Sequence, residues 1–444
     1  MPIDLVIRGA SVVTSAGVEV GDLCIDGGKF VEGGGTEARR SVDGRGLLAL
    51  PGLIDSHLHF NDPGRADWEG VPTGSAALAA GGGTCFFDMP LNSSPPTLDA
   101  DSFDQKLAVA QAGAVTDFGL WGGLTPGNLD QLDELAARGV VGFKAFMCHS
   151  GIEDFAWAHE RSLRRGMQLA AALNLIVAVH AESPAMTARL TEEIRHRGGR
   201  AVADYLASRP VEAELEAIAL AIALAEETKC RLHIVHVSSP RGVELVRRAA
   251  EAKRCDVTCE TCPHYLVLNA QDMARMGAPA KCAPPLRSAA ESEALWQCLE
   301  DETVVFVASD HSPAPEAMKQ SDDFFVVWGG IAGVQSTLPI LLSRRPALPP
   351  ELIARLTAGN VAARYRIASK GRIATGYDAD LVLVEEDARY ELRREDLLDR
   401  HRMSPYVGRT FLGRVRQTFV RGQVVFAEGR IVSAPIGRLV RPVV

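Results

Sequence analysis

Hydrophobic and polar residues alternate in a βα rhythm over the middle of the chain. Between about residues 53 and 310, short runs rich in Val, Ile and Phe are each followed by a longer stretch of helical character, which is typical of βα units around a parallel sheet. Eight such runs occur, at 52–57, 84–89, 116–121, 140–145, 175–180, 232–236, 256–260 and 304–310. Eight strands with helical crossovers predict a TIM (β/α)8 barrel.

The two chain ends have a different pattern, with short strand-like runs broken by frequent turns. Neither end is long enough to bury its own faces. We therefore expect residues 1–50 and 367–444 to pair into one composite β-sandwich domain, into which an α/β barrel formed by residues 51–366 is inserted. The segments 129–137 and 211–227 predict outer helices. Residues 183–209, between the fifth strand and its helix, are a candidate cover for the barrel mouth.

Composition limits the kinds of partner. The chain has 444 residues, 47% of them hydrophobic, a formal net charge of −9 and interspersed acidic and basic residues. This distribution argues against a nucleic-acid or anionic membrane surface and favours a small-molecule partner. The first residues lack the basic and apolar regions of a signal peptide, and no apolar run reaches the length of a membrane span, so we expect a cytoplasmic protein.

Potential metal ligands lie at several predicted strand ends. His57 and His59 are two apart on the first strand, so both imidazoles point the same way. Alone, this pair could equally be two surface histidines on an edge strand. Further ligand-type residues sit in or after the fourth, fifth, sixth and eighth strands: Lys144, His180, His236 and Asp310. The carboxyl ends of barrel strands face the active site. Four imidazoles and a carboxylate exceed what one tetrahedral ion with an open position needs, but suit two ions that share a bridging group.

Lys144 needs a separate explanation, because an ammonium is repelled by two dications and has no lone pair to donate. Carboxylation of its amine by carbon dioxide would give an anionic carbamate whose two oxygens can bridge both ions. The alternative is a lysine that pairs with a carboxylate at the barrel mouth.

Several motifs together resemble those of one known family. They lie at residues 51–65, 88–96, 142–151, 259–265, 309–313 and 370–380. On these motifs the chain resembles, nearly end to end, the amidohydrolase superfamily in its branch of dihydroorotases, hydantoinases and allantoinases, and among these most closely the allantoinase family. The resemblance implies that His57, His59 and Asp310 hold the more buried ion, that His180 and His236 hold the more exposed one, and that carboxylated Lys144 bridges them. It also implies a homotetramer. Zinc, cobalt, manganese and iron all suit this ligand set.

The predicted substrate is uncharged. Asn61 stands where dihydroorotase-like sequences carry an arginine that grips the substrate carboxylate, and a neutral amide cannot replace a bidentate guanidinium. Leu91 replaces a second asparagine of those enzymes, with Asn92 one step further. His149 stands where hydantoinases place a tyrosine, so it either bonds the scissile carbonyl or merely packs in its loop. These features favour a neutral ring with a ureido arm.

Other candidate substrate contacts carry simpler alternatives. Asn92 and Ser312 could bind the ureido arm, or serve the turns before the prolines that follow them. Cys282 is expected to line the pocket through its backbone, with no catalytic role for its thiol. Arg65 either contacts substrate or forms a solvated ion pair with Glu69.

The reaction implied is hydrolysis of the hydantoin ring amide of allantoin to allantoate. A hydroxide shared by two dications would attack the carbonyl, and Asp310 would accept its proton and pass it to the leaving ring nitrogen. The alternatives are hydantoinase, dihydropyrimidinase or dihydroorotase activity on another cyclic ureide, and, from other classes, a ureide sensor or a non-catalytic scaffold with this fold. Such scaffolds shed metal ligands, whereas all six are present here.

Overall fold

The molecule is built around a closed ring of parallel strands. The structure is a computed structural model that describes residues 2–33 and 37–443. The ring consists of β6 (Leu53–Leu58), β7 (Gly83–Asp88), β8 (Asp117–Leu120) with β9 (Gly122–Gly123), β10 (Phe143–Phe146), β11 (Ile176–His180), β12 (Arg231–Ile234), β13 (Val257–Thr261) and β14 (Phe306–Val307). Eight of these strands each overlap one of the eight predicted runs. The ninth, β9, continues the third strand just beyond its predicted run.

Backbone hydrogen bonds close the ring at two places. The strands pair in chain order within two sheets, β6-β7-β8 and β9 to β14. The sheets join at the third strand, where the N–H of Trp121 donates to Asp88 (3.1 Å) and that of Val141 to Leu120 (2.9 Å). They close where the N–H of His59 donates to His311 (2.8 Å) and that of Asp310 to His57 (2.9 Å). The predicted TIM barrel is confirmed, and its closing seam carries three of the predicted metal ligands.

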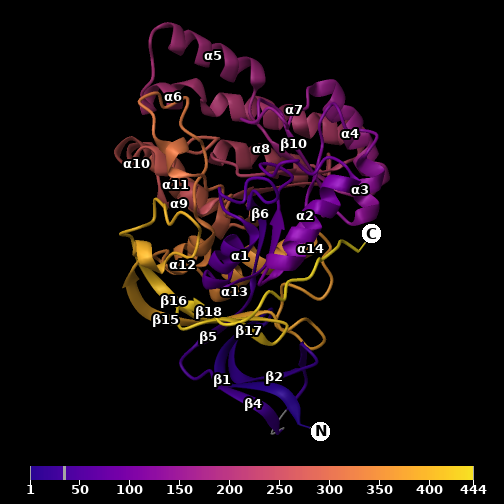
Figure 1. Ribbon diagram of the computed structural model, residues 1–444, viewed down its shortest axis with the longest axis vertical. Helices are drawn as coiled ribbons and strands as arrows, with labels where there is room; N and C mark the ends of the chain where they lie inside the picture. The colour runs from indigo at the N-terminus through magenta and orange to yellow at the C-terminus, as the bar shows by residue number, and fades with distance from the viewer. Residues whose placement is uncertain (1, 34–36, 444) are drawn as a thin grey trace.

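Helices surround the barrel (Figure 1). They are α1 (Val71–Ala80), α2 (Ala100–Gly113), α3 (Leu132–Arg138), α4 (Glu160–Ala172), α7 (Val211–Thr228), α8 (Pro240–Glu251), α9 (Pro263–Val267), α10 (Ala270–Met276), α11 (Ala289–Glu300), α12 (Thr337–Leu342), α13 (Pro350–Ala354) and α14 (Asn360–Arg364). The predicted outer helices are α3 and α7. The α7 sequence is rich in Ala, Leu and Glu, which favour helix, and it ends where Lys229 adopts a left-handed conformation (φ 57°).

The segment expected to cover the barrel mouth forms two helices, α5 (Pro184–His196) and α6 (Val202–Ser208). Ser183 caps α5 by accepting from the N–H of Met186, and Pro184 occupies the first turn. Asp204 performs a similar role for α6, since its side chain accepts from the N–H of Ala201. Figure 1 places α5 at the upper end of the molecule, beyond α6.

The two chain ends form one nine-stranded sheet at the opposite end of the molecule (Figure 1). Its strands are β1 (Ile3–Thr14), β2 (Gly17–Asp26), β3 (Lys29–Val31), β4 (Ala38–Asp43), β5 (Leu48–Pro51), β15 (Leu381–Glu391), β16 (Thr410–Val420), β17 (Gln423–Ala427) and β18 (Arg430–Ile431). β5 joins the two ends because it pairs with β1 on one side and β15 on the other. A cluster of buried residues from both ends, including Ile7, Ile25 and Leu381, forms its core.

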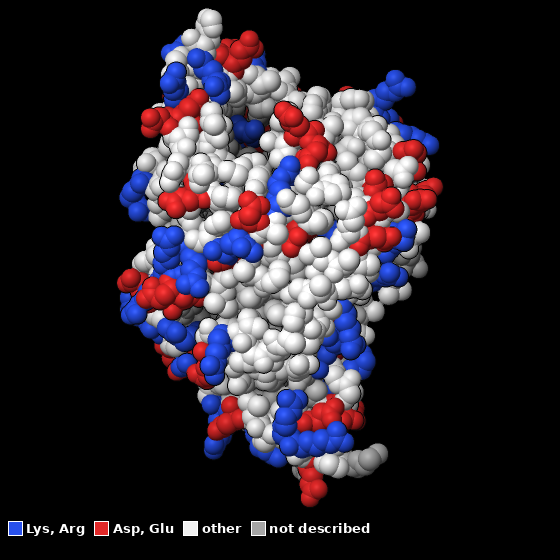
Figure 2. All heavy atoms as spheres, viewed as in Figure 1, with Lys and Arg blue, Asp and Glu red and all other residues white. Residues whose placement is uncertain are grey.

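The sheet is tied to the barrel by buried charges and by the C-terminal tail. The ammonium of Lys370 pairs with Asp117 of β8 and with Asp380, at 2.6 Å each. The tail runs back to the barrel, where the N–H of Phe118 donates to Arg438 (3.0 Å) and that of Val440 to Phe118 (2.7 Å). Cationic and anionic side chains are intermixed on the face shown in Figure 2. Within the described residues, no helix combines the length and apolar character needed to span a membrane.

Candidate metal centre and substrate cavity

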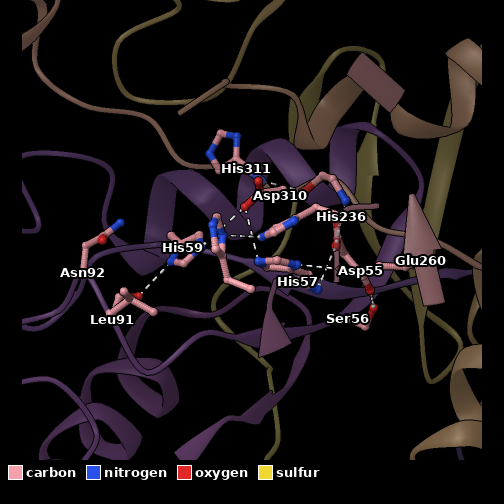
Figure 3. Close-up of polar contacts among 12 residues, drawn as sticks. Asp55, Ser56, His57, His59, Leu91, Asn92, His236, Glu260, Asp310 and His311 are labelled. Atoms are coloured by element: carbon pink, nitrogen blue, oxygen red, sulfur yellow. Dashed lines mark hydrogen bonds and ion pairs between the residues drawn. The ribbon is translucent and has the colours of Figure 1, made fainter. Parts of the chain in front are cut away.

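The predicted ligands converge at the carboxyl ends of the barrel strands in two groups. In the first, Nε2 of His57 and Nε2 of His59 face one oxygen of Asp310, at 3.3 and 3.5 Å (Figure 3). In the second, Nδ1 of His180 lies 3.1 Å from Nε2 of His236. The groups adjoin, since the ring centroids of His57 and His236 are 5.3 Å apart. The barrel thus brings together residues from four strand ends.

Hydrogen bonds on the far sides of the rings fix which nitrogens face the centre. Nδ1 of His57 donates to the carboxylate of Glu260 (2.6 Å), and Nδ1 of His59 donates to the carbonyl of Leu91 (2.8 Å; Figure 3). In a neutral imidazole the other nitrogen then carries the lone pair. Nε2 of both histidines is therefore ready to bind a cation, in the arrangement typical of histidine ligands.

In the second group, His180 is oriented by a similar hydrogen bond, but through its other ring nitrogen. Nε2 of His180 donates to the buried carboxylate of Glu182 (2.8 Å), which leaves the lone pair on Nδ1, facing His236. Burial lowers the pKa of His57, His180 and His236 below the usual histidine value. The rings are consequently neutral near pH 7, as metal ligands must be.

Lys144, in β10, is fully buried close to both groups. Its charge acts on the pKa of His57, His180 and His236. Within the described residues its Nζ has no hydrogen-bond partner, so the alternative of a lysine paired with a carboxylate does not describe this side chain. Burial lowers its pKa to about 8, which raises the fraction of neutral, nucleophilic amine at physiological pH.

Asp310 is held as a carboxylate in a strained backbone. Burial raises the pKa of Asp310, but the neighbouring imidazoles of His57 and His59 outweigh this and hold the pKa at about 2. The residue has a positive φ of 45°, and His236 and Asn61 also have positive φ values, of 39° and 64°. Such conformations are costly outside glycine and cluster at functional sites.

This donor set fits two divalent cations. It combines four neutral imidazoles, three of them with tautomers fixed by hydrogen bonds, one ionised carboxylate, and a buried amine without a partner among the described residues. His57, His236 and Asp310 each offer an atom within 4.8 Å of the other two. Imidazole and carboxylate donors suit Zn²⁺ and related metals.

A cavity of about 370 Å³ opens above the strand ends. Four of the predicted substrate contacts line it: Asn92, His149, Cys282 and Ser312. Nδ1 of His149 accepts from the N–H of Gly151 (3.0 Å), so its Nε2 carries the proton and can donate to a ligand. Burial raises the pKa of the Cys282 thiol, while the carbonyl of this residue accepts from the hydroxyl of Tyr205 (2.8 Å).

Asn61 and Arg65 are not among the lining residues and instead hold Asn92. Nδ2 of Asn92 donates to Oδ1 of Asn61 (3.1 Å), and Arg65 donates to the carbonyl of Asn92 (2.5 Å). The expected ion pair between Arg65 and Glu69 is wrong, since Arg65 pairs with Asp154 at 3.1 Å. Glu69 is fully buried and accepts from the backbone N–H of Arg400, a distant residue that the local sequence could not indicate.

Three cationic side chains line the cavity, and each already binds protein oxygen. Arg195 pairs with Asp323 (3.1 Å), and Arg209 pairs with Glu182. The ammonium of Lys281 donates to the carbonyls of Phe324 and Val327, at 2.5 Å each. The wall therefore offers polar groups, and each of these three cationic side chains already binds protein oxygen, a carboxylate for Arg195 and Arg209 and backbone carbonyls for Lys281.

Two carboxylates that orient the histidines, Glu182 and Glu260, were not predicted from the sequence. Glu182 could have been found, because it lies two residues after His180 and repeats the spacing of His57 and His59. Glu260 lies within β13, and its contact with His57 depends on a strand that is distant in sequence. It also accepts from Ser56 (3.1 Å) and contacts Nε2 of His233 (3.2 Å).

Comparison with known proteins agrees with this geometry. The chain is 53% identical to an allantoinase of Rubrobacter xylanophilus, over 99% of this chain and 98% of that protein. It is 50% identical to an allantoinase of Solibacter usitatus, over 99% of this chain and 97% of that protein. The solved L-hydantoinase (dihydropyrimidinase) of Arthrobacter aurescens superposes with a TM-score of 0.95 at 32% identity, covering 99% of this chain and 100% of that one. The sequence model of the amidohydrolase family matches residues 48–425, and the chain belongs to that family.

Proposed function

We propose that this protein hydrolyses the ring amide of allantoin to give allantoate. The observation that carries the proposal is a cavity with metal ligands at its base and a wall whose cations, Arg195, Arg209 and Lys281, are all bound to protein oxygen. Such a wall can hydrogen-bond a neutral ureide, whereas the cations that line it among the described residues are already engaged by protein oxygen and would have to give up these contacts to bind a ring carboxylate. The full-length relatives named allantoinase support the same substrate.

The centre would hold two divalent ions, with zinc the first candidate. His57, His59 and Asp310 would bind one ion, and His180 and His236 the other. The neutral amine of Lys144 would add to the carbon of carbon dioxide and lose a proton, and the resulting carbamate oxygens would bridge the pair. When bound, the ions would lower the pKa of water toward about 7 and polarise the ring carbonyl.

The chain's own residues would orient the ring and move the proton. Asp310, with a pKa held at about 2, is ionised at neutral pH and can accept the proton of the attacking water. It would then pass that proton to the ring nitrogen of the breaking amide bond, which becomes the NH2 of a ureido group that stays attached to the product. Nε2 of His149 would donate to the carbonyl oxygen as negative charge develops there. Asn92, held by Asn61 and Arg65, and Ser312 would hydrogen-bond the ureido arm.

A comparison of substrates tests the proposal. Metal-loaded protein is assayed with allantoin, hydantoin, dihydrouracil and dihydroorotate, and allantoin is expected to have the highest kcat/KM. Preferred turnover of hydantoin or dihydrouracil would favour the activity named for the solved L-hydantoinase. Preferred turnover of dihydroorotate would contradict the proposal that the wall, whose cations are engaged by protein oxygen, selects a neutral ring. Light scattering would test the homotetramer that the family resemblance implies.

A further inference from the structure

We propose that Arg209, the residue that follows α6, is a positioning residue for the His180 and His236 end of the centre. Through it, the α5–α6 segment (residues 184–208) and metal binding at these two histidines are coupled. The inference rests on the proposed two-metal centre and adds a role for a cavity-wall residue that contributes no ligand atom.

The first link runs from the guanidinium of Arg209 to a metal ligand. Glu182 is fully buried, and its Oε2 accepts from Nε2 of His180 at 2.8 Å. The same oxygen pairs with Arg209. The guanidinium fixes the position of this carboxylate and offsets the cost of burying its charge. Without Arg209, Glu182 would lose the contact that holds it against Nε2 of His180, and the ring would no longer be held with its lone pair on Nδ1.

The second link runs from the backbone of Arg209 to the other ligand. Its carbonyl accepts from the guanidinium of Arg287 (2.6 Å), which also donates to the hydroxyl of Ser238 (2.9 Å). Ser238 lies two residues after His236 and is anchored by Glu214, which accepts from its N–H (2.8 Å). Arg209 thus connects the loops that carry both histidines.

The segment that ends at Arg209 is also part of the cavity wall. Its lining residues are Thr191, Arg195, Tyr205 and Ser208. It docks on the loop after β14, where Arg195 pairs with Asp323 and the N–H of Phe324 donates to the carbonyl of Arg200 (2.8 Å). Coupling between two sites is reciprocal. Metal bound at His180 and His236 should therefore stabilise the docked segment, and the docked segment should strengthen metal binding.

The test compares three substitutions with wild type. Arg209→Met removes the counterion and keeps most of the stem, whereas Arg209→Lys keeps the charge. Glu182→Gln removes the charge with little change in volume, which guards against a folding defect in the arginine variants. A fourth substitution, Arg189→Met, is the matched control, because Arg189 lies on α5 and, among the described residues, its ion pair is with exposed Glu193.

Bound zinc per chain is measured in chelator-buffered zinc, and hydrogen exchange of residues 184–208 is followed with and without metal. We expect two ions in wild type and in Arg189→Met. Arg209→Met and Glu182→Gln should bind one of the two ions about 10- to 100-fold more weakly, with Arg209→Lys in between. Metal should slow exchange of the segment in wild type but not in Arg209→Met.

Three results would overturn the coupling alone. The first is wild-type zinc binding by Arg209→Met, and the second is hydrogen exchange of residues 184–208 that does not change with metal although wild type binds two ions. An equal loss of both ions in Arg209→Met would also contradict it, because the contacts reach only one end of the centre. Absence of zinc binding in wild type would instead overturn the two-metal centre, and the coupling with it.

Discussion

The carboxylate of Glu260 accepts a hydrogen bond of 2.6 Å from Nδ1 of His57, and both side chains are buried. This contact keeps the lone pair of His57 on Nε2, toward Asp310. A neutral amide would accept more weakly and make His57 a poorer donor. We expect Glu260→Gln to weaken metal binding at this end of the centre about 10- to 100-fold, measured by competition with a chelator. The control is Glu385→Gln, on the sheet. Unchanged affinity in Glu260→Gln would show that the tautomer is fixed in another way.

Lys144 gives a sharp test of the carbamate. Arginine is also cationic and long, but its guanidinium stays protonated and cannot add to carbon dioxide. Lys144→Arg and Lys144→Ala should both lose bound metal and turnover together. A small added carboxylate should restore part of both in Lys144→Ala, where it can take the place of the carbamate, and not in Lys144→Arg, where the space is filled. Full metal content in Lys144→Arg, measured by elemental analysis, would exclude a bridging role.

Substitution of Asp310 should distinguish its role in proton transfer from its role as a metal ligand. Asn keeps the shape and one oxygen of the side chain but cannot accept a proton at neutral pH. We expect Asp310→Asn to lower kcat by at least about 100-fold while the protein retains most of its metal. Near-normal turnover would remove Asp310 from the proton path. Loss of metal in parallel with activity would mean that Asp310 acts only as a metal ligand.

The barrel and the convergence of the candidate ligands at its strand ends could be predicted because both follow from local sequence. Each strand is a short apolar run, and parallel topology alone brings the strand ends together. The partners of those ligands depend on closure of the ring. Glu260 lies 203 residues from His57, and nothing near either residue indicates the contact.

The direction of the Asn61 side chain could not be predicted from the alternation of residues along a strand. Asn61 lies two residues after His59, so a continued strand would point it into the cavity. β6 ends at Leu58, however, and Asn61 has a left-handed backbone (φ 64°). Its side chain turns away and binds Asn92. Asn61, which stands where dihydroorotases carry arginine, therefore lies behind the cavity wall and supports the lining residue Asn92.

His149 should contribute to the transition state through its Nε2 proton. Phe and Tyr differ at this position by a single hydroxyl donor. We expect His149→Phe to lower kcat about 10²- to 10³-fold with a small change in KM, the effect of losing one oxyanion donor. His149→Tyr should recover part of that loss. Steady-state kinetics on allantoin measure both variants. A kcat in His149→Phe close to that of wild type would mean that His149 only packs in its loop.

Asp55 should make the stability of the metal-free protein depend on pH. Its Oδ1 accepts from the backbone N–H groups of His57 (3.2 Å) and Ser309 (3.1 Å), at the closing seam of the barrel. Its Oδ2 has no partner among the described residues, and burial raises the pKa to about 7. The folded protein thus binds a proton here that the unfolded chain has released, between the ordinary aspartate pKa of about 4 and about 7.

The contribution of Asp55 to stability is accordingly complete below pH 4 and lost as the pH rises through 7. Asp55→Asn stays neutral throughout, so its free energy of unfolding relative to wild type should rise over this window, by about 2–4 kcal/mol. Urea unfolding of both metal-free proteins at several pH values measures the difference. Glu19→Gln, which removes an exposed carboxyl on β2, should follow wild type. A pH-independent difference between Asp55→Asn and wild type would mean that the buried carboxyl stays ionised at the seam.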